Sequence, residues 1–258
     1  MTHRTILAVA AAVLLSAGCG QNEYESRLAQ TADYFSHVNR LNANLKSAVG
    51  FGGLQLRLPL QFDPLADDPD TEVDETQPYF LDLELPGLVG AYRAPVLVDV
   101  DGQDEEHPAF LYVMSNGPEL SARASGDQSV DPLTLTDRIL EAVQTAFGVV
   151  LPPGADGDGV QPNVRYPERL PRIAVYDTTT DYTAVRLVPA EPFGSFAIPM
   201  EYTLYAAAGP GDQQVALMLA APEQPVPSDE LRKRVTMMLE TARIDAPSGG
   251  GGARPSAF

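Results

Sequence analysis

The sequence is poor in the residues on which many kinds of protein depend. Its 258 residues include one cysteine, three histidines and no tryptophan, and 17 lysines and arginines stand against 35 aspartates and glutamates. A single cysteine excludes a disulfide scaffold and any metal site built from several cysteines. The formal net charge of −18 excludes ordinary nucleic-acid binding, because phosphates require a basic surface. The same charge disfavours electrostatic attachment to an anionic lipid surface.

The remaining composition is that of a chain that folds around a hydrophobic core. Hydrophobic residues make up 44% of it and charged residues 20%, unlike a disordered or a collagen-like chain. The sequence contains no G-x-S-x-G, P-loop, G-x-G-x-x-G or C-x-x-C pattern. We therefore expect no cofactor and nominate no catalytic residue.

The N-terminal segment predicts a signal peptide. Arg4 and Thr5 are followed by ten consecutive Ile, Leu, Val or Ala residues, Ile6–Leu15, and then by three small residues. A run of this length is too short to span a membrane as a helix, but it suits the apolar region of a signal peptide. The only cysteine of the chain, Cys19, follows directly.

The sequence Leu15-Ser16-Ala17-Gly18-Cys19 resembles the lipobox of bacterial lipoproteins, in which the cysteine is lipid-modified and becomes the first residue. The usual lipobox has leucine three positions before the cysteine, where this chain has Ser16. The resemblance implies a stable lipid anchor on Cys19, because several acyl chains bind a bilayer far more firmly than one. Gly20, in place of aspartate, implies the outer membrane rather than retention at the inner one. The alternative is an ordinary signal peptide followed by a cysteine by chance.

Cleavage before Cys19 would define the organisation of the chain. Removal of Arg4 would leave the mature protein with one more net negative charge than the full chain. We predict four regions, namely a signal peptide (1–18), a lipidated tether (19–22), a single α+β domain (23–246) and a flexible tail rich in glycine, proline and serine (247–258).

Three helices are predicted in the mature chain. The first covers residues 23–49 and ends at the glycines of residues 50–53; because Thr31 and Asn42 interrupt its apolar stripe, docking on its own domain is favoured over a coiled coil. The central helix is expected to begin at Asp131-Pro132 and to end at Gly148. The last is expected to have Ser228 as its cap, Asp229 and Glu230 in its first turn and Arg243 in its last. Apolar stripes mark the three helices, namely Tyr24, Leu28, Phe35, Val38 and Leu45; Leu135, Ile139, Val143 and Phe147; and Leu231, Val235, Met238 and Ala242.

Alternating apolar and polar residues predict strands joined by hairpins. Pro59 favours an edge position for the first strand. An acidic loop (101–108) is expected between the second and third strands, and a long loop over residues 149–171. The predicted strands are 54–62, 96–100, 109–114, 172–176, 182–188, 198–204 and 215–219. The pattern predicts an α+β fold, with a mainly antiparallel sheet packed by the N-terminal, central and C-terminal helices.

From Gly53 onward the order of these elements resembles the PsbP-like α/β sandwich. The shared features are a first strand led by glycine, a meander, paired late strands and a terminal amphipathic helix. The chain differs in having no tryptophan, which that family commonly carries soon after the first strand. The resemblance implies a binding or assembly role rather than catalysis.

Clusters of acidic residues are the remaining candidates for a site. Asp68, Asp70, Glu72 and Asp74 are spaced like calcium ligands, but Val73 stands where an EF-hand needs glycine, so a solvated acidic loop is favoured. A second acidic group lies at 99–106, where Asp101-Gly102 is more simply a turn. The two histidines of the mature chain, His37 and His107, are too far apart to form a sequence-local metal pair.

The sequence therefore predicts an exported, lipid-anchored envelope lipoprotein with a non-catalytic binding or assembly role. Its expected partners are the membrane, through Cys19, and a protein of the envelope that the sequence does not identify; nucleic acid is not among them. One alternative is an exported carboxylate-dependent hydrolase, whose two acidic residues can come from anywhere in the chain. Another is a calcium-stabilised interaction module that uses the Asp67–Asp74 loop.

Overall fold

The computed structural model describes residues 3–65, 83–125, 133–152, 161–171, 179–191, 198–226 and 229–245, with side chains from Glu23 onward. The chain divides into two compact units, Met1–Asn44 and Leu45–Phe258. The first unit contains one helix, α1 (His3–Asn44). Among the residues that the structure describes, no helix holds a stretch long and apolar enough to cross a membrane.

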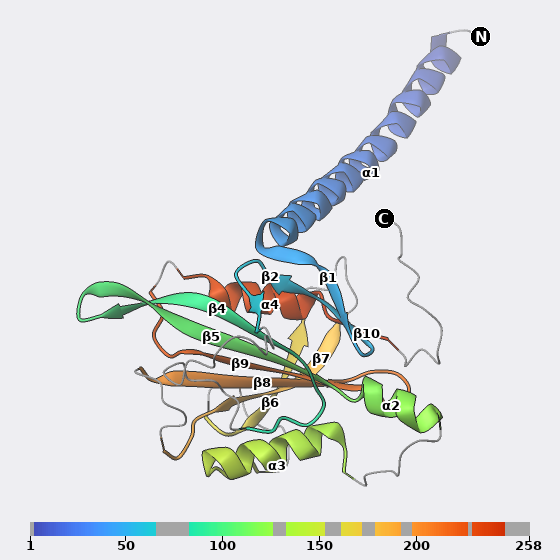
Figure 1. Cartoon of the computed structure of the whole chain (residues 1–258). Coiled ribbons are helices and arrows are strands. Elements are labelled where there is room, and N and C mark those ends of the chain that lie inside the picture. Colours follow the sequence, from blue (N-terminus) through green and yellow to red (C-terminus); the bar gives the residue numbers. More distant parts are fainter. Residues whose placement is uncertain are drawn as a thin grey trace. The chain divides into compact units, whose positions relative to one another are not determined.

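The second unit is built on a seven-stranded sheet in which every neighbouring pair is antiparallel. The order across the sheet is β3-β4-β5-β9-β8-β7-β6 (Figure 1). The strands are β3 (Asp63–Pro64), β4 (Leu88–Val100), β5 (Gln103–Ser115), β6 (Arg165–Leu170), β7 (Thr180–Leu187), β8 (Met200–Ala208) and β9 (Gln214–Pro222).

The helix α3 (Leu135–Phe147) covers one face of this sheet (Figure 1). Side chains on alternate positions of a strand point to the same face, so Tyr202 and Leu204 of β8 both join the core beneath α3. Phe147 lies against Tyr202 with ring centroids 4.8 Å apart. The helix contributes five buried residues to this core, namely Leu135, Ile139, Leu140, Val143 and Phe147.

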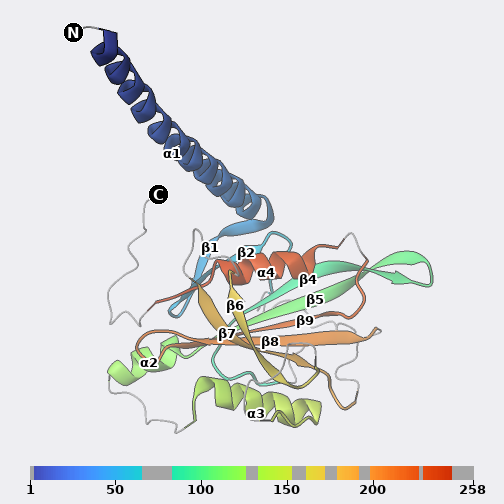
Figure 2. The same cartoon turned by 180° about the vertical axis from the view of Figure 1, so that it is seen from behind.

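The opposite face is covered by α4 (Leu231–Glu240) and by a small sheet of β1 (Leu45–Phe51), β2 (Leu54–Pro59) and β10 (Arg243–Ile244). Figures 1 and 2 show α3 and α4 on opposite sides of the large sheet. The buried hydroxyl of Tyr182 on β7 donates a hydrogen bond of 3.0 Å to the carbonyl oxygen of Leu239 on α4. The second unit therefore has three layers, and its class is the predicted α+β class with a mainly antiparallel sheet and with central and C-terminal helices.

The helix predicted over residues 23–49 is too long. α1 ends at Asn44, and Leu45–Phe51 form β1, which pairs with β2. Of the glycines expected to end the helix, Gly50 lies in β1, and Gly52 and Gly53 form the hairpin turn with φ angles of 51° and 92°. The order of the small sheet is β1-β2-β10, so β2 is its central strand rather than an edge. Pro59 is tolerated because β10 reaches only Gln55 and Leu54 at the other end of β2.

Two predicted loops contain strand. The edge strand β6 lies within the segment expected to be a loop over 149–171, and Pro167 is compatible with its edge position. β6 pairs with the start of β7, whereas the sequence predicted 172–176 as the partner strand. Residues 172–176 lie outside the described residues. β5 begins at Gln103, so most of the expected acidic loop is strand. Asp101 and Gly102 form the predicted turn, with φ angles of 55° and 83°.

The predicted helix starts also shift. The N-cap of α3 is Thr134, whose hydroxyl oxygen accepts a hydrogen bond of 3.1 Å from the backbone N–H of Asp137. Asp131, Pro132 and Ser228 lie outside the described residues. α4 begins at Leu231, after Asp229 and Glu230, and Arg243 belongs to β10 rather than to the last turn. Gly148 ends α3 as predicted, with a φ angle of 62°.

A buried polar junction connects the end of β5, the β1–β2 turn, the start of β9 and a helix that the sequence did not reveal, α2 (Gly117–Ala124). The hydroxyl of Ser115 donates to the Gly52 carbonyl (2.7 Å) and accepts from the Gly117 N–H (3.0 Å) and from Nε2 of Gln213 (2.8 Å). Nε2 of Gln213 also donates to the Gly52 carbonyl, at 3.0 Å. Ser115 and Gln213 are fully buried. The junction therefore holds together segments far apart in the sequence.

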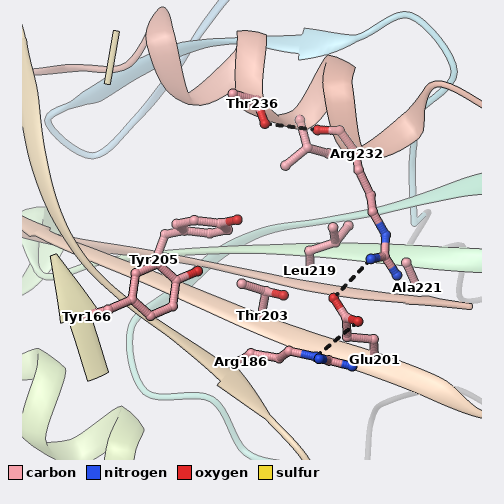
Figure 3. A pocket seen from close by; sticks show the side chains of 10 residues that line it. Tyr166, Arg186, Glu201, Thr203, Tyr205, Leu219, Ala221, Arg232 and Thr236 are labelled. Atoms are coloured by element: carbon pink, nitrogen blue, oxygen red, sulfur yellow. Dashed lines mark hydrogen bonds and ion pairs between the residues drawn. The ribbon is translucent and has the colours of Figure 1, made fainter. Parts of the chain in front are cut away.

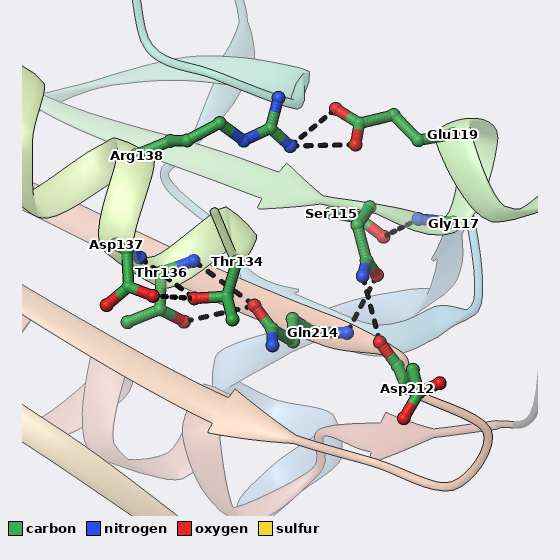
Figure 4. A network of polar contacts seen from close by, with 10 residues as sticks. Ser115, Gly117, Glu119, Thr134, Thr136, Asp137, Arg138, Asp212 and Gln214 are labelled. Carbon is green, nitrogen blue, oxygen red and sulfur yellow. Dashed lines mark hydrogen bonds and ion pairs between the residues drawn. The ribbon is translucent and has the colours of Figure 1, made fainter. Parts of the chain in front are cut away.

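The same contacts continue to α3, as Figure 4 shows. Gln214, which follows Gln213, accepts a hydrogen bond of 3.2 Å from the N–H of Thr136 at the start of α3. Arg138 of α3 lies 2.7 Å from both carboxylate oxygens of Glu119 on α2. The end of β5 and the start of β9, which lie at the same end of the large sheet, are thus tied to α2 and α3.

We expect Ser115→Ala to lower the free energy of unfolding by about 1–3 kcal/mol, because it leaves the buried N–H of Gly117 without its acceptor. Urea denaturation followed by circular dichroism measures the change. Ser125→Ala is the matched control, since its hydroxyl is exposed and bonds only within α2, to the Ser121 carbonyl. Equal stability losses in the two variants would contradict a structural role for the junction.

Candidate functional site

A polar pocket lies between α4 and the face of the large sheet that α4 covers. Its volume is about 420 Å³, within the range of small-molecule sites. Four strands and α4 contribute to it, and we call it the α4 pocket. Its lining residues are Tyr166, Arg186, Glu201, Thr203, Tyr205, Leu219, Ala221, Arg232, Val235 and Thr236 (Figure 3).

The register of the sheet places these side chains in rows. Thr203 of β8 pairs with Arg186 of β7 on one side and with Leu219 of β9 on the other. Glu201 and Tyr205 lie two residues before and after Thr203, so all three side chains point to the α4 face. Strand pairing alone therefore assembles the floor of the pocket from residues of three strands.

The carboxylate of Glu201 is held between two guanidinium groups. Its Oε2 lies 3.1 Å from Nε of Arg186, and its Oε1 lies 3.3 Å from Nη1 of Arg232. The Glu201 side chain is only 15% exposed, whereas those of Arg186 and Arg232 are 36% and 46% exposed. At the pocket edge, Glu223 lies 3.6 Å from Nη2 of Arg186. The two positive and two negative charges of this group balance.

Arg232 is fixed in place by α4 and by the end of β9. Its Nη2 donates to the carbonyl oxygens of Pro222 (3.3 Å) and Glu223 (3.2 Å). The hydroxyl of Thr236, one turn further along α4, donates to the Arg232 carbonyl at 3.1 Å. The guanidinium is therefore pre-positioned, which lowers the entropic cost of any hydrogen bond that it makes to a ligand.

Two tyrosines form the other end of the pocket. Figure 3 shows the hydroxyls of Tyr166 and Tyr205 on the side that faces Thr203 and the ion pairs. The ring of Tyr205 packs edge-on against Tyr182, with centroids 6.2 Å apart. Burial raises the pKa of Tyr205 well above its ordinary value, and the neighbouring Tyr166, Glu168 and Glu201 add to this rise. The Tyr205 hydroxyl therefore stays protonated at physiological pH and is available as a hydrogen-bond donor.

A further pocket, of about 400 Å³, opens on the α3 side of the sheet. Several of its polar groups are used in local structure: Thr134 caps α3, and Gln214 accepts from Thr136. Its one carboxylate, Asp181, lies 2.6 Å from Nε of Arg169. The α4 pocket is the stronger candidate because its polar groups converge on the cavity.

None of the site residues predicted from the sequence is among the described residues that line the α4 pocket. Cys19 lies in α1, and its side chain is outside the described part of the chain. The calcium candidates Asp68, Asp70, Glu72 and Asp74 also lie outside the described residues. Within the described residues, no group of three or more His, Cys, Asp or Glu side chains is placed to hold a metal ion.

The second acidic group forms the tip of the β4–β5 hairpin. There the carboxylate of Asp99 accepts a hydrogen bond of 2.7 Å from the N–H of Gly102, which stabilises the turn. His107 lies on β5, 3.7 Å from Glu105, and His37 lies on α1, with Nδ1 3.1 Å from Arg40. The two histidines lie in different units.

Sequence reasoning missed the α4 pocket. The alternation of Glu201 and Thr203 with Tyr202 and Leu204 predicts a strand with one polar face, which usually faces solvent. In the structure both faces of β8 are covered, so the polar face becomes the floor of a pocket. One signal could have indicated the pocket. An amphipathic C-terminal helix needs a sheet face to pack on, so a polar strand face could be covered by that helix rather than by solvent.

A comparison with models of known protein families finds no match to the chain, and a comparison with curated proteins finds none either.

Proposed function

We propose that the protein is an exported lipoprotein of the bacterial envelope, anchored through lipid on Cys19, with a non-catalytic binding role in the α4 pocket. The observation that carries the anchor is the lipobox-like sequence Leu15–Cys19 directly after the ten-residue apolar run. Gly20 favours the outer membrane over the inner one. A protein of the envelope is the further partner in this proposal.

A lipid anchor suits the physical properties of the chain. A multiply acylated cysteine holds a protein on a bilayer without a spanning helix. The net charge of −18 opposes direct contact between the folded unit and anionic headgroups. Lipid and charge together would keep the second unit at the membrane surface and in solvent.

The α4 pocket supports the binding role. It combines two guanidinium groups, a largely buried carboxylate and several hydroxyls within one cavity, and such convergence of polar groups is typical of ligand sites. A hydrolase with two facing carboxylates would need a second acid opposite Glu201. Among the described lining residues Glu201 is the one carboxylate, and two arginines hold it.

The anchor is tested by labelling cells with an alkyne fatty acid and measuring its incorporation into the protein. We expect strong labelling of the wild type and complete loss in Cys19→Ser, because the thiol is the acylation site. Ser16→Leu, which restores the usual lipobox, is the control and is expected to keep the label. Label that persists in Cys19→Ser, or a wild type without label, would disprove the anchor.

A further inference from the structure

We propose that the α4 pocket binds a neutral polyhydroxylated ligand, one or two sugar rings in size. This inference rests on the binding role proposed above and specifies the ligand of the same site. It follows from the balance of charge in the pocket, from the arrangement of donors and acceptors, and from the tyrosine rings at one end.

The charge balance disfavours strongly charged ligands. Arg186 and Arg232 are matched by Glu201 within the lining and by Glu223 at its edge. An anion would be attracted by the two guanidinium groups but repelled by the two carboxylates. A cation would be attracted by the carboxylates but repelled by the guanidinium groups. A ligand without charge meets neither penalty.

Donors and acceptors alternate across the floor of the pocket. The carboxylate of Glu201 accepts, the guanidinium groups on either side of it donate, and the hydroxyls of Thr203 and Tyr205 do both. A sugar hydroxyl also donates and accepts at the same time, so adjacent hydroxyls can pair with a carboxylate oxygen and a neighbouring guanidinium. Hydrogen bonds to charged groups are the stronger class, which favours this pairing.

Thr203 places a hydroxyl on the floor of the pocket. The residue is only 8% exposed, and it lines the cavity. A hydroxyl that faces a cavity takes a hydrogen-bond partner from whatever fills the cavity, so a ligand hydroxyl can pair with it. Figure 3 shows this hydroxyl on the floor, between the tyrosine end and the ion pairs.

The tyrosine end suits the apolar face of a sugar ring. Tyr166 and Tyr205 come from β6 and β8, and both pair in register with Ala184 of the strand between them. The two rings therefore lie on the same face of the sheet, on either side of β7. A pyranose has one face of C–H groups, which packs on aromatic carbon while its hydroxyls reach the polar floor.

The test is a titration of the full-length protein, followed by saturation-transfer NMR, with four neutral sugars: glucose, galactose, mannose and N-acetylglucosamine. Glucuronate and glucosamine serve as charged analogues of the same ring. We expect at least one neutral sugar to bind, and the charged analogues of that ring to bind more weakly. Absence of binding by all four neutral sugars, or a preference for either charged analogue over its neutral counterpart, would overturn the proposal.

Two variants locate the site. Thr203→Val keeps the shape of the side chain and removes a hydroxyl that lines the cavity, so it should fold normally and weaken binding several-fold. Glu201→Gln removes the charged acceptor and should weaken binding by about tenfold; tighter binding in this variant would instead identify an anion site. Arg169→Gln, on the opposite face of the sheet, is the control and should bind like the wild type. Equal affinity in Thr203→Val and the wild type would place the sugar elsewhere.

This result is independent of the lipid anchor. Sugar binding is measured in solution, whereas fatty-acid labelling reports only on Cys19. Loss of label with retained sugar binding would refute the anchor alone, and retained label without sugar binding would refute the ligand assignment alone.

Discussion

Gly117→Ala is expected to destabilise the second unit strongly. A Cβ atom at this position would lie 1.7 Å from the carbonyl oxygen and 2.5 Å from the carbonyl carbon of Gly52. The obstructing atoms are backbone, and the hydroxyl of Ser115 and the amide of Gln213 hold that carbonyl in place. The β1–β2 hairpin would have to move away from α2, at a cost of at least about 3 kcal/mol.

Urea denaturation of Gly117→Ala measures this loss, with Gly50→Ala as the control. A Cβ atom at Gly50 meets nothing within 4 Å, so this second glycine of the same region should change the stability by no more than about 0.5 kcal/mol. A Gly117→Ala variant as stable as the wild type would show that the β1–β2 turn does not press against the start of α2.

Phe147→Ala is expected to lower the free energy of unfolding by about 3–5 kcal/mol, because it opens a cavity in the core beneath α3. Phe147 is 2% exposed, and its ring lies 4.8 Å from that of Tyr202 on β8. Since α3 ends at this residue, the ring packs the last turn of the helix against β8 of the large sheet.

Val150→Ala is the matched control for the loss of a side chain near the end of α3. Val150 is 83% exposed, so its truncation should change the stability by no more than about 0.5 kcal/mol. A loss below about 1 kcal/mol in Phe147→Ala would contradict the packing of α3 on this face, because truncation of a packed phenylalanine costs more.

The sequence predicted the elements whose periodicity is long and regular. The four-residue spacing from Leu135 to Phe147 and the glycine after it located α3, and the alternation around Tyr202 and Leu217 located β8 and β9. These patterns are reliable because each buries one side of an element, and burial decides its structure. The α+β class followed from their order.

Short segments could not be predicted because long-range pairing decides them. Leu45–Phe51 continues the helical pattern of α1, yet it pairs with β2 and becomes a strand. Arg165–Leu170 contains a proline and few apolar residues, and it is a strand because β7 offers it an open edge. In both segments the local preference is weak, so the partner strand determines the outcome.

The α4 pocket shows the same limit for function. Arg186, Glu201 and Arg232 are separated by 15 or more residues in the sequence, and no spacing links them. They meet because β7 and β8 are neighbours and α4 packs across both. The lipobox-like segment, in contrast, is a local signal and can be identified from the sequence alone.

The most direct test of the proposed anchor is mass spectrometry of the N-terminal peptide of the protein isolated from bacterial membranes. We predict that the peptide begins at Cys19 and carries the mass of a diacylglyceryl group, usually with a further acyl chain on the amino group. A protein that still begins at Met1, or an unmodified residue 19 in a soluble fraction, would contradict the proposal that this is a lipid-anchored binding protein.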